Sequence, residues 1–346
     1  MFADVGQPIQ ECARGNDHGL GHQIAPIFQA NTQNLAADPF GGLCLVAANT
    51  DRLGLMVGVT NPVTRHPAVT AAAIATVQVE SAGRAVLGVG RGDSSLGHIG
   101  RRPATVGTTE RFAAQLQRYL RSEVVDQDGY PSEIPWIARS GQSKVPLDVA
   151  ATGPRMLALG GRLAERVTVN VGALPDRMAS AVGLARAARA EAAPPGQLSL
   201  GAYLVVTAHP DARVARQLAR GPLAAYAHFS GMPGAPVEAL TAPDRAVVEA
   251  VAADYVRSGH STQHPADGSI SGPPRHLQHL DDAFVDRFGV VGTPAQCVSR
   301  LLELAQLGLD RVLLVEGRDP AAPDEQRRAH RCLAEEVLPA LHAMAA

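Results

Sequence analysis

The sequence is poor in cysteine and in aromatic residues. Four cysteines occur in 346 residues, none of them in a Cys-x-x-Cys pair, and aromatic residues make up 4%. A chain of this length buries enough apolar surface to be stable without disulfide bonds. We therefore expect reduced thiols and a cytoplasmic protein. The four cysteines are Cys12, Cys44, Cys297 and Cys332.

Long apolar runs and an excess of one charge are also missing. The longest apolar stretch, 71–79, is interrupted by Thr76 and Gln78 and is too short to span a bilayer. The first thirty residues contain acidic side chains and no apolar segment typical of a signal peptide. The formal net charge is −2, so bulk electrostatics favour neither nucleic acid nor an anionic membrane as a partner. What remains is a globular protein in which 46% of the residues are hydrophobic.

Short apolar runs alternate with segments of helical periodicity along the chain. Runs such as 53–57 and 312–315 are almost continuously apolar, which is typical of parallel strands buried on both faces. Pro67, Pro154 and Pro294 stand where helices should begin, because the first helical turn tolerates the missing N–H of proline. The expected strands are 22–28, 53–59, 85–90, 145–150, 166–171, 198–206 and 310–316, and the expected helices are 38–48, 67–79, 109–121, 154–164, 175–190, 212–228, 293–307 and 324–343.

Repeated strand–helix units predict an α/β fold, either an open doubly wound sheet or a closed (β/α)8 barrel. A barrel requires a short or incomplete first strand at 2–5, a partner chain, or a truncated start, because little sequence precedes the first helical segment. The stretches 121–144 and 230–280 read as insertions, the first irregular and the second placed before the last unit. We expect one extra helix at 244–257, and a single domain over 1–346.

Polar and glycine-rich residues follow three consecutive expected strands, at the edge where α/β barrels carry their function. The third strand leads into Thr-Asn-Pro-Val-Thr-Arg-His-Pro at 60–67. The fourth leads into Gly-Val-Gly-Arg-Gly-Asp at 88–93, and the fifth into Ala-Ala-Thr-Gly-Pro-Arg at 150–155. The sequence therefore predicts a binding site built from these loops.

At these motifs the sequence resembles the bacterial luciferase-like oxidoreductases, and within them the coenzyme F420-dependent branch typified by methylenetetrahydromethanopterin reductase. Segments 58–67, 83–93, 151–160 and 288–294 carry the resemblance, which extends over about 39–317. It implies a (β/α)8 TIM barrel that binds a flavin or deazaflavin at the carboxyl ends of its strands. It also implies a non-proline cis peptide in a bulge after the third strand, at Gly58-Val59.

The loop after the fifth strand is a candidate phosphate site on physical grounds. Gly153 permits close backbone approach, and Pro154 begins a helix whose unpaired N–H groups suit an anion, with the amides of Gly153 and Met156 as donors. An ordinary strand–helix turn is the alternative. Together with the resemblance, these arguments give the cofactor-binding candidates Gly58, Val59, Thr60, Asn61, Arg91, Ala151, Thr152, Gly153, Pro154, Arg155 and Met156.

The catalytic group is less evident from the sequence. The second expected strand is followed by amides and hydroxyls and by no carboxylate, so the candidates are Gln29, Asn31 and His66. His66 serves either the substrate or the cap of the next helix. Thr60 and Asn61 bind either the ligand or the backbone of their own turn, and we favour the ligand for both.

Three functions are compatible with these residues. The first is hydride transfer between coenzyme F420 and a small organic substrate, the second a reduced-FMN monooxygenase, and the third a non-catalytic flavin-binding barrel. Arg65, Arg91 and Arg155 favour F420, because its long acidic tail gains from a row of arginines. The alternative is that these arginines are solvated or paired with Asp93 and Glu110.

Three further expectations complete the prediction. We expect Asp93 to cap the turn that follows it, and we expect no metal site. Small residues on the helical segments 38–48 and 67–79 permit close helix packing between chains. They predict a homodimer.

Overall fold

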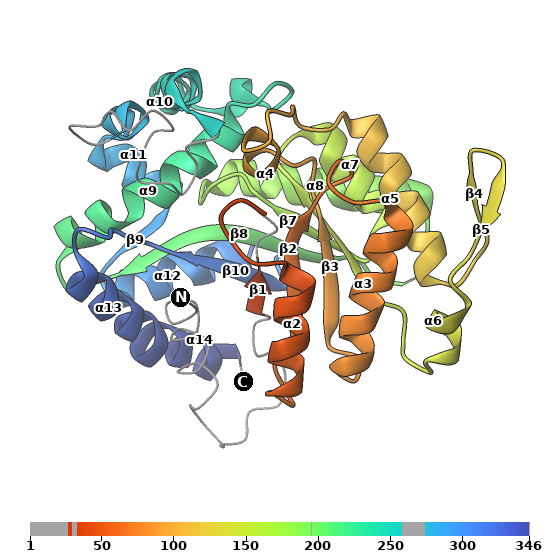
Figure 1. Cartoon of the computed structure of the whole chain (residues 1–346). Coiled ribbons are helices and arrows are strands. Elements are labelled where there is room, and N and C mark those ends of the chain that lie inside the picture. The colour runs from red at the N-terminus through yellow and green to blue at the C-terminus, as the bar shows by residue number, and fades with distance from the viewer. Residues whose placement is uncertain (1–26, 30–32, 195, 258–273, 346) are drawn as a thin grey trace.

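The computed structural model describes residues 27–29, 33–194, 196–257 and 274–345. Eight strands form one parallel sheet in the order β1-β2-β3-β6-β7-β8-β10, with β9 pairing on β8 (Figure 1). No described pairing joins β1 to β10, so the described sheet is a half-barrel. The strands are β1 (Ile27–Gln29), β2 (Leu55–Thr60), β3 (Ala85–Val89), β6 (Leu147–Ala151), β7 (Arg166–Val169), β8 (Ser199–Ala208), β9 (Val290–Gly292) and β10 (Arg311–Glu316).

The expected α/β fold is confirmed, and the seven expected strands correspond to strands of the sheet. The short β9 was not expected, because three residues are too few to show a period. Of the expected strand 22–28, only its end lies in β1, and residues 2–5 and 22–26 lie outside the described residues. The incomplete first strand of a barrel therefore stays a prediction.

Strand alternation separates two apolar layers. In β6, Leu147 and Val149 are fully buried in the main core, which they share with the surrounding helices. On the opposite side of the sheet, Met56, Tyr203 and Leu313 form a second, small cluster with their neighbours. Because side chains of a strand alternate between faces, β2, β3, β8 and β10 contribute to both layers.

Most helices begin within one residue of the predicted start, but the helix expected at 109 begins at Val106, because Thr105 caps it. Asp38 caps α2 through its carboxylate, which accepts a hydrogen bond from the Phe40 amide at 3.0 Å, and Thr293 forms a capping box with Gln296. The helices that follow the strands are α2 (Pro39–Ala48), α3 (Pro67–Glu80), α5 (Val106–Leu120), α7 (Pro154–Leu163), α8 (Pro175–Ala192), α12 (Pro294–Ala305), α13 (Pro323–Cys332) and α14 (Leu338–Ala345).

The first inserted stretch is more regular than expected. It contains the hairpin of β4 (Val125–Gln127) and β5 (Tyr130–Ser132), followed by the short helix α6 (Pro135–Arg139). The turn of the hairpin is Asp128-Gly129, both with positive φ, and the Asp126 carboxylate accepts from the Gly129 amide. The expectation of an irregular segment was therefore wrong. The sequence did not indicate the hairpin, because strands of three residues are too short to show alternation.

The second inserted stretch shares an apolar cluster with the helices on either side of it and with the sheet. The cluster includes Val205 of β8, Leu223, Val248, Phe284 and Phe288, which are all buried. The expected extra helix at 244–257 begins earlier, because Thr241 caps it, and residues 258–273 of the stretch lie outside the described residues. The stretch contains α10 (Ala242–Asp254) and the 3-10 turns η1 (Val237–Ala239) and η3 (Arg275–His279), while α9 (Ala212–Ser230) precedes it and α11 (Asp282–Phe288) follows it.

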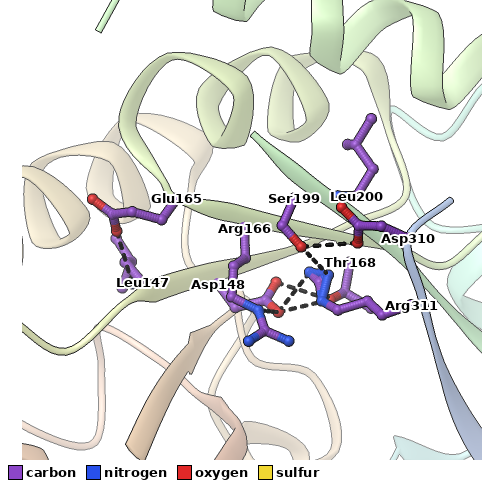
Figure 2. A network of polar contacts seen from close by, with 9 residues as sticks. All are labelled: Leu147, Asp148, Glu165, Arg166, Thr168, Ser199, Leu200, Asp310 and Arg311. Carbon is purple, nitrogen blue, oxygen red and sulfur yellow. Dashed lines mark hydrogen bonds and ion pairs between the residues drawn. The ribbon is translucent and has the colours of Figure 1, made fainter. Parts of the chain in front are cut away.

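A buried ionic network occupies the amino-terminal ends of the strands. Figure 2 shows Asp148, which is fully buried, facing Thr168, Arg166 and Arg311. The Thr168 hydroxyl donates to the Asp148 carboxylate at 2.8 Å, and Arg311 donates to the same carboxylate at 2.9 Å. This end of an α/β barrel normally serves stability rather than catalysis.

Removing the charge of Asp148 tests that role. Asp148→Asn should lower the free energy of unfolding by about 3–5 kcal/mol, because it leaves buried arginines without their counter-ion. Asp324→Asn is the control, since Asp324 pairs with Arg327 on the exposed face of α13 and should lose only about 0–1 kcal/mol. Urea unfolding followed by circular dichroism measures both, and equal losses would contradict the assignment.

Candidate functional site

The carboxyl end of β2 contains a bulge. Val57 pairs with Leu87 and Thr60 with Val89, so Gly58 and Val59 together oppose a single residue of β3. The peptide between Gly58 and Val59 is cis, as the resemblance implies. The bulge turns this part of the strand toward the end of the sheet where the polar loops gather.

Two glycines of the neighbouring strand make room for the bulge. A Cβ atom on Gly88 would lie 2.2 Å from the Val57 carbonyl oxygen, and one on Gly90 would lie 2.9 Å from the Val59 side chain. No other residue fits at Gly88 without a backbone shift. From the sequence, this glycine-rich stretch was expected only as a loop beside the cofactor. The signal for its role was the spacing of two glycines on one face of a strand.

The residues after the bulge mostly serve the loop itself. The Asn61 side chain is buried, and its carbonyl oxygen accepts from the amides of Val63 and Thr64 at 3.0 and 3.1 Å. This is the turn chemistry that the sequence left as the alternative. Thr60 is also fully buried, and its backbone carbonyl accepts from the Gly90 amide at 2.9 Å.

The catalytic candidates receive little support from the structure. The exposed His66 caps α3, and its Nδ1 atom accepts from the Ala68 amide at 3.2 Å. Gln29 is the last residue of β1, and Asn31 lies outside the described residues. His66 therefore has the capping role that the sequence left open.

The start of α7 offers an uncapped helix N-terminus. Gly153 is the N-cap residue and provides no side chain, while its carbonyl accepts from the Met156 amide at 3.0 Å. The Met156 amide therefore already has an acceptor, and the Arg155 amide is the first N–H of the helix. A Cβ on Gly153 would lie 2.6 Å from the Gly234 carbonyl oxygen, so the close backbone approach expected there is made by the insertion. Ala151 and Met156 are buried at this turn.

The three expected arginines have different surroundings. Arg65 forms an ion pair with Asp38 and lies over the Phe40 ring, 4.8 Å from its centroid. The Arg91 guanidinium donates to the Ala104 carbonyl at 2.6 Å, and Arg155 is exposed. Pairing of these arginines with Asp93 or Glu110 was wrong. Asp93 contacts His228 and Arg257, and Glu110 pairs with Arg162.

Beside Arg65 the loops after β1 and β2 line a cavity of about 360 Å³ that is open to solvent. The Gln33 amide donates to the Ser95 carbonyl at 2.7 Å and thereby joins the loop after β1 to the loop after β3. The cavity lining combines polar and charged groups at the carboxyl edge of the sheet. It is lined by Gln33, Ala36, Asp38, Thr64 and Arg65.

A carboxylate–imidazole pair lies at the same edge and was missed by the sequence analysis. The His228 Nε2 atom is 3.1 Å from the Asp93 carboxylate, and both side chains are nine-tenths buried. Tyr255 stacks on the His228 ring at 4.1 Å, and burial together with the charge of Asp93 raises the pKa of Tyr255 well above its usual value. Asp93 makes no capping hydrogen bond to the helix α4 (Ser94–Gly97), so the expected cap was wrong.

One further group at the carboxyl end fits a bound ring. Asn170 follows β7 directly, and its buried Oδ1 atom has no hydrogen-bond partner within the described part of the chain. A flavin or deazaflavin ring carries an imide N–H that such an acceptor can bind. The bulge, the Asn170 acceptor and the uncapped start of α7 together fit a planar cofactor with a phosphate tail.

The described residues contain no group of three or more His, Cys, Asp or Glu side chains placed to hold a metal ion. Among the same residues, no helix is both long enough and apolar enough to cross a membrane.

The family of the chain follows from its match over most of its length. The model of the family described as luciferase-like monooxygenase matches residues 19–311. The chain belongs to this family. Its identification as a luciferase-like oxidoreductase, made from the motifs around the bulge, is thereby confirmed.

The individual relatives point to one branch of the family. The chain is 27% identical to a 5,10-methylenetetrahydromethanopterin reductase of Methanolobus tindarius, over 87% of each chain. Its fold is similar to the coenzyme F420-dependent tetrahydromethanopterin reductase of Methanopyrus kandleri, with a TM-score of 0.66 and 22% identity over 91% and 90% of the two chains. An F420-dependent secondary alcohol dehydrogenase with a bound F420–acetone adduct also has a TM-score of 0.66, at 15% identity over 88% and 84%.

The contact between the bulge and Gly88 can be tested by adding one methyl group. Gly88→Ala should destabilise the protein by about 1–3 kcal/mol, because its Cβ must displace backbone of β2. Gly183→Ala is the matched control: it lies in α8 with open space around it and should be stabilising by about 0.5–1 kcal/mol. Thermal unfolding compares the two, and a neutral Gly88→Ala would show that the bulge does not depend on this glycine.

Proposed function

We propose that the protein transfers hydride between coenzyme F420 and a small organic substrate. The observation that carries this proposal is the bulge at Gly58-Val59, seated on Gly88 and Gly90 at the carboxyl end of the sheet. The proposal is supported by an F420-dependent reductase whose fold is similar to that of this chain over nine-tenths of its length. The relatives named as reductases of a methanopterin support a reduced heterocycle as the substrate class, without naming the substrate.

In this proposal each part of the site has a separate task. The bulge supports one face of the ring, and Asn170 accepts a hydrogen bond from its imide N–H. The start of α7 binds the phosphate through the Arg155 amide and the positive end of the helix. When bound, F420 would donate a hydride in its reduced form or accept one in its oxidised form, while the protein orients the substrate against it.

Helix α9 and the insertion that follows it exclude water from this end of the sheet. His228 on α9 bonds to Asp93 of the loop after β3, and Gly234 of the insertion lies against Gly153 of the loop after β6. The two contacts hold α9 and the insertion over loops that line the proposed site. Exclusion of water strengthens the electrostatic contacts made inside such a site.

A reduced-FMN monooxygenase is the second candidate. The family model itself carries a monooxygenase description. The uncapped start of α7 also suits the single phosphate of FMN. The two candidates differ in how many charges the ligand brings, because F420 carries an additional acidic tail.

Titration with both cofactors separates these candidates. We expect F420 to bind and its affinity to fall steeply between about 0.01 and 1 M salt, where the Debye length drops from roughly 30 to 3 Å. FMN should respond less, since it carries one phosphate. Fluorescence and absorbance titrations measure both affinities. Micromolar binding of FMN without binding of F420 would replace the reductase by the monooxygenase, and binding of neither would support a non-catalytic barrel.

We further propose a cytoplasmic homodimer in which each chain is one domain. Two apolar side chains on neighbouring helices are open to solvent, Leu45 on α2 with 71% exposure and Val69 on α3 with 54%. An interface would bury them. Light scattering at micromolar concentration should give twice the mass of the chain, and Leu45→Glu with Val69→Glu should reduce it to that of one chain. A wild-type particle with the mass of one chain would contradict the dimer.

A further inference from the structure

A buried arginine lies beside the proposed site, and two of its three guanidinium nitrogens have no hydrogen-bond partner among the described residues. Arg177 lies in the first turn of α8 and is 4% exposed. One nitrogen of its guanidinium donates to the Val171 carbonyl at 3.1 Å and contacts the Ser230 hydroxyl at 3.3 Å. The Nε atom and the other terminal nitrogen are buried and have no hydrogen-bond partner in the part of the chain that the structure describes.

The charges around Arg177 do not compensate for its burial. Burial lowers the pKa of Arg177 to about 10, although the Asp244 carboxylate opposes the shift. That carboxylate is bound elsewhere, by Arg287 at 2.6 Å and by the Thr241 hydroxyl at 2.8 Å. Asp176, in the same turn of α8, is exposed to solvent. No carboxylate among the described residues hydrogen-bonds to the Arg177 guanidinium.

The position of the guanidinium adds a second positive potential. Its bond to Val171 places it over the loop that leads into α8, where the positive end of an 18-residue helix lies. Leu174 is the N-cap residue and provides no capping side chain. A cation at an uncapped helix start is unfavourable unless an anion joins it. Such an anion would accept hydrogen bonds from the Arg177 guanidinium and from the free amides at the start of α8.

The surroundings of Arg177 connect it to the proposed cofactor site. Helices α7 and α8 pack closely, since a Cβ on Gly161 would lie 2.3 Å from the Ala185 carbonyl oxygen. Ser230, which contacts Arg177, ends α9 four residues before Gly234, which lies against the start of α7. Arg177 therefore lies at the carboxyl edge, between the start of α8 and the insertion.

We propose that Arg177, with Ser230 and the start of α8, binds an oxyanion of a ligand, either a phosphate or a carboxylate. The two unpartnered guanidinium nitrogens form one edge of the fork that such groups bind in a bidentate manner. The anion belongs to the substrate or to the tail of the cofactor, and this second step rests on the proposed function. The site is separate from the start of α7, which Arg177 does not cap.

Inorganic phosphate is the first probe, and its binding needs no cofactor. Calorimetric titration of the wild-type protein should show binding, and Arg177→Gln should weaken it tenfold or more. Arg186→Gln is the matched control, because Arg186 is an exposed arginine on the same helix and should leave phosphate binding unchanged. No binding by the wild type at millimolar phosphate, or equal affinity of Arg177→Gln, would overturn the proposal.

A second variant covers the case in which Arg177→Gln does not fold, as judged by circular dichroism. Ser230→Ala removes one hydroxyl beside the guanidinium and should weaken phosphate binding several-fold. If Arg177→Gln is unfolded and Ser230→Ala binds phosphate as the wild type does, the proposal fails.

The source of the anion is determined with F420 and with the deazaflavin that lacks its phosphate tail. If the tail is the source, Arg177→Gln weakens F420 binding and not that of the tail-less deazaflavin, and phosphate competes with F420. If the substrate is the source, F420 binding is unchanged and phosphate binds together with it. Failure of F420 to bind at all overturns the proposed function and leaves the phosphate result standing.

Discussion

The close approach of β2 and β3 at their carboxyl ends is the constraint on which the site depends. Neighbouring strands of a sheet lie about 4.8 Å apart, so a two-residue bulge must move into space that the side chains of the next strand normally occupy. Here Gly88 and Gly90 leave that space free. The strands rejoin beyond the bulge through the bond from the Gly90 amide to the Thr60 carbonyl. The loops of both strands consequently leave the sheet side by side.

The two ends of the sheet differ in how their buried charges are paired. At the amino-terminal end, the charge of Asp148 is matched by the opposite charges of Arg166 and Arg311, although the Nε atoms of both arginines make no hydrogen bond within the described residues. At the carboxyl end, no carboxylate of the described residues hydrogen-bonds to Arg177, and buried atoms of Arg177 and Asn170 have no partner there. Buried polar atoms without partners are costly, and at this end the proposed ligands would complete them.

Helix α9 and the insertion that follows it act on the binding face through three separate contacts. Helix α9 supplies His228 to Asp93 and Ser230 to Arg177, and the insertion supplies the Gly234 backbone to the start of α7. These contacts reach the loops after β3, β7 and β6 in turn, while Val205 anchors the insertion to β8 through an apolar cluster. A shift of the insertion must therefore change the surroundings of the ring, the anion and the phosphate together.

The sequence alone determined the features that depend on nearby residues. Almost continuous apolar runs in the strands, and proline at several helix starts, are local, and they predicted the parallel α/β fold and the loops that carry the site. The family motif placed the bulge at Gly58-Val59. Only the tertiary structure decided that Asn61 and His66 serve a turn and a helix cap, because the same side chains suit a ligand equally well. It alone brought His228 to Asp93, 135 residues apart, and buried Arg177, since such contacts follow from packing and leave no pattern along the chain.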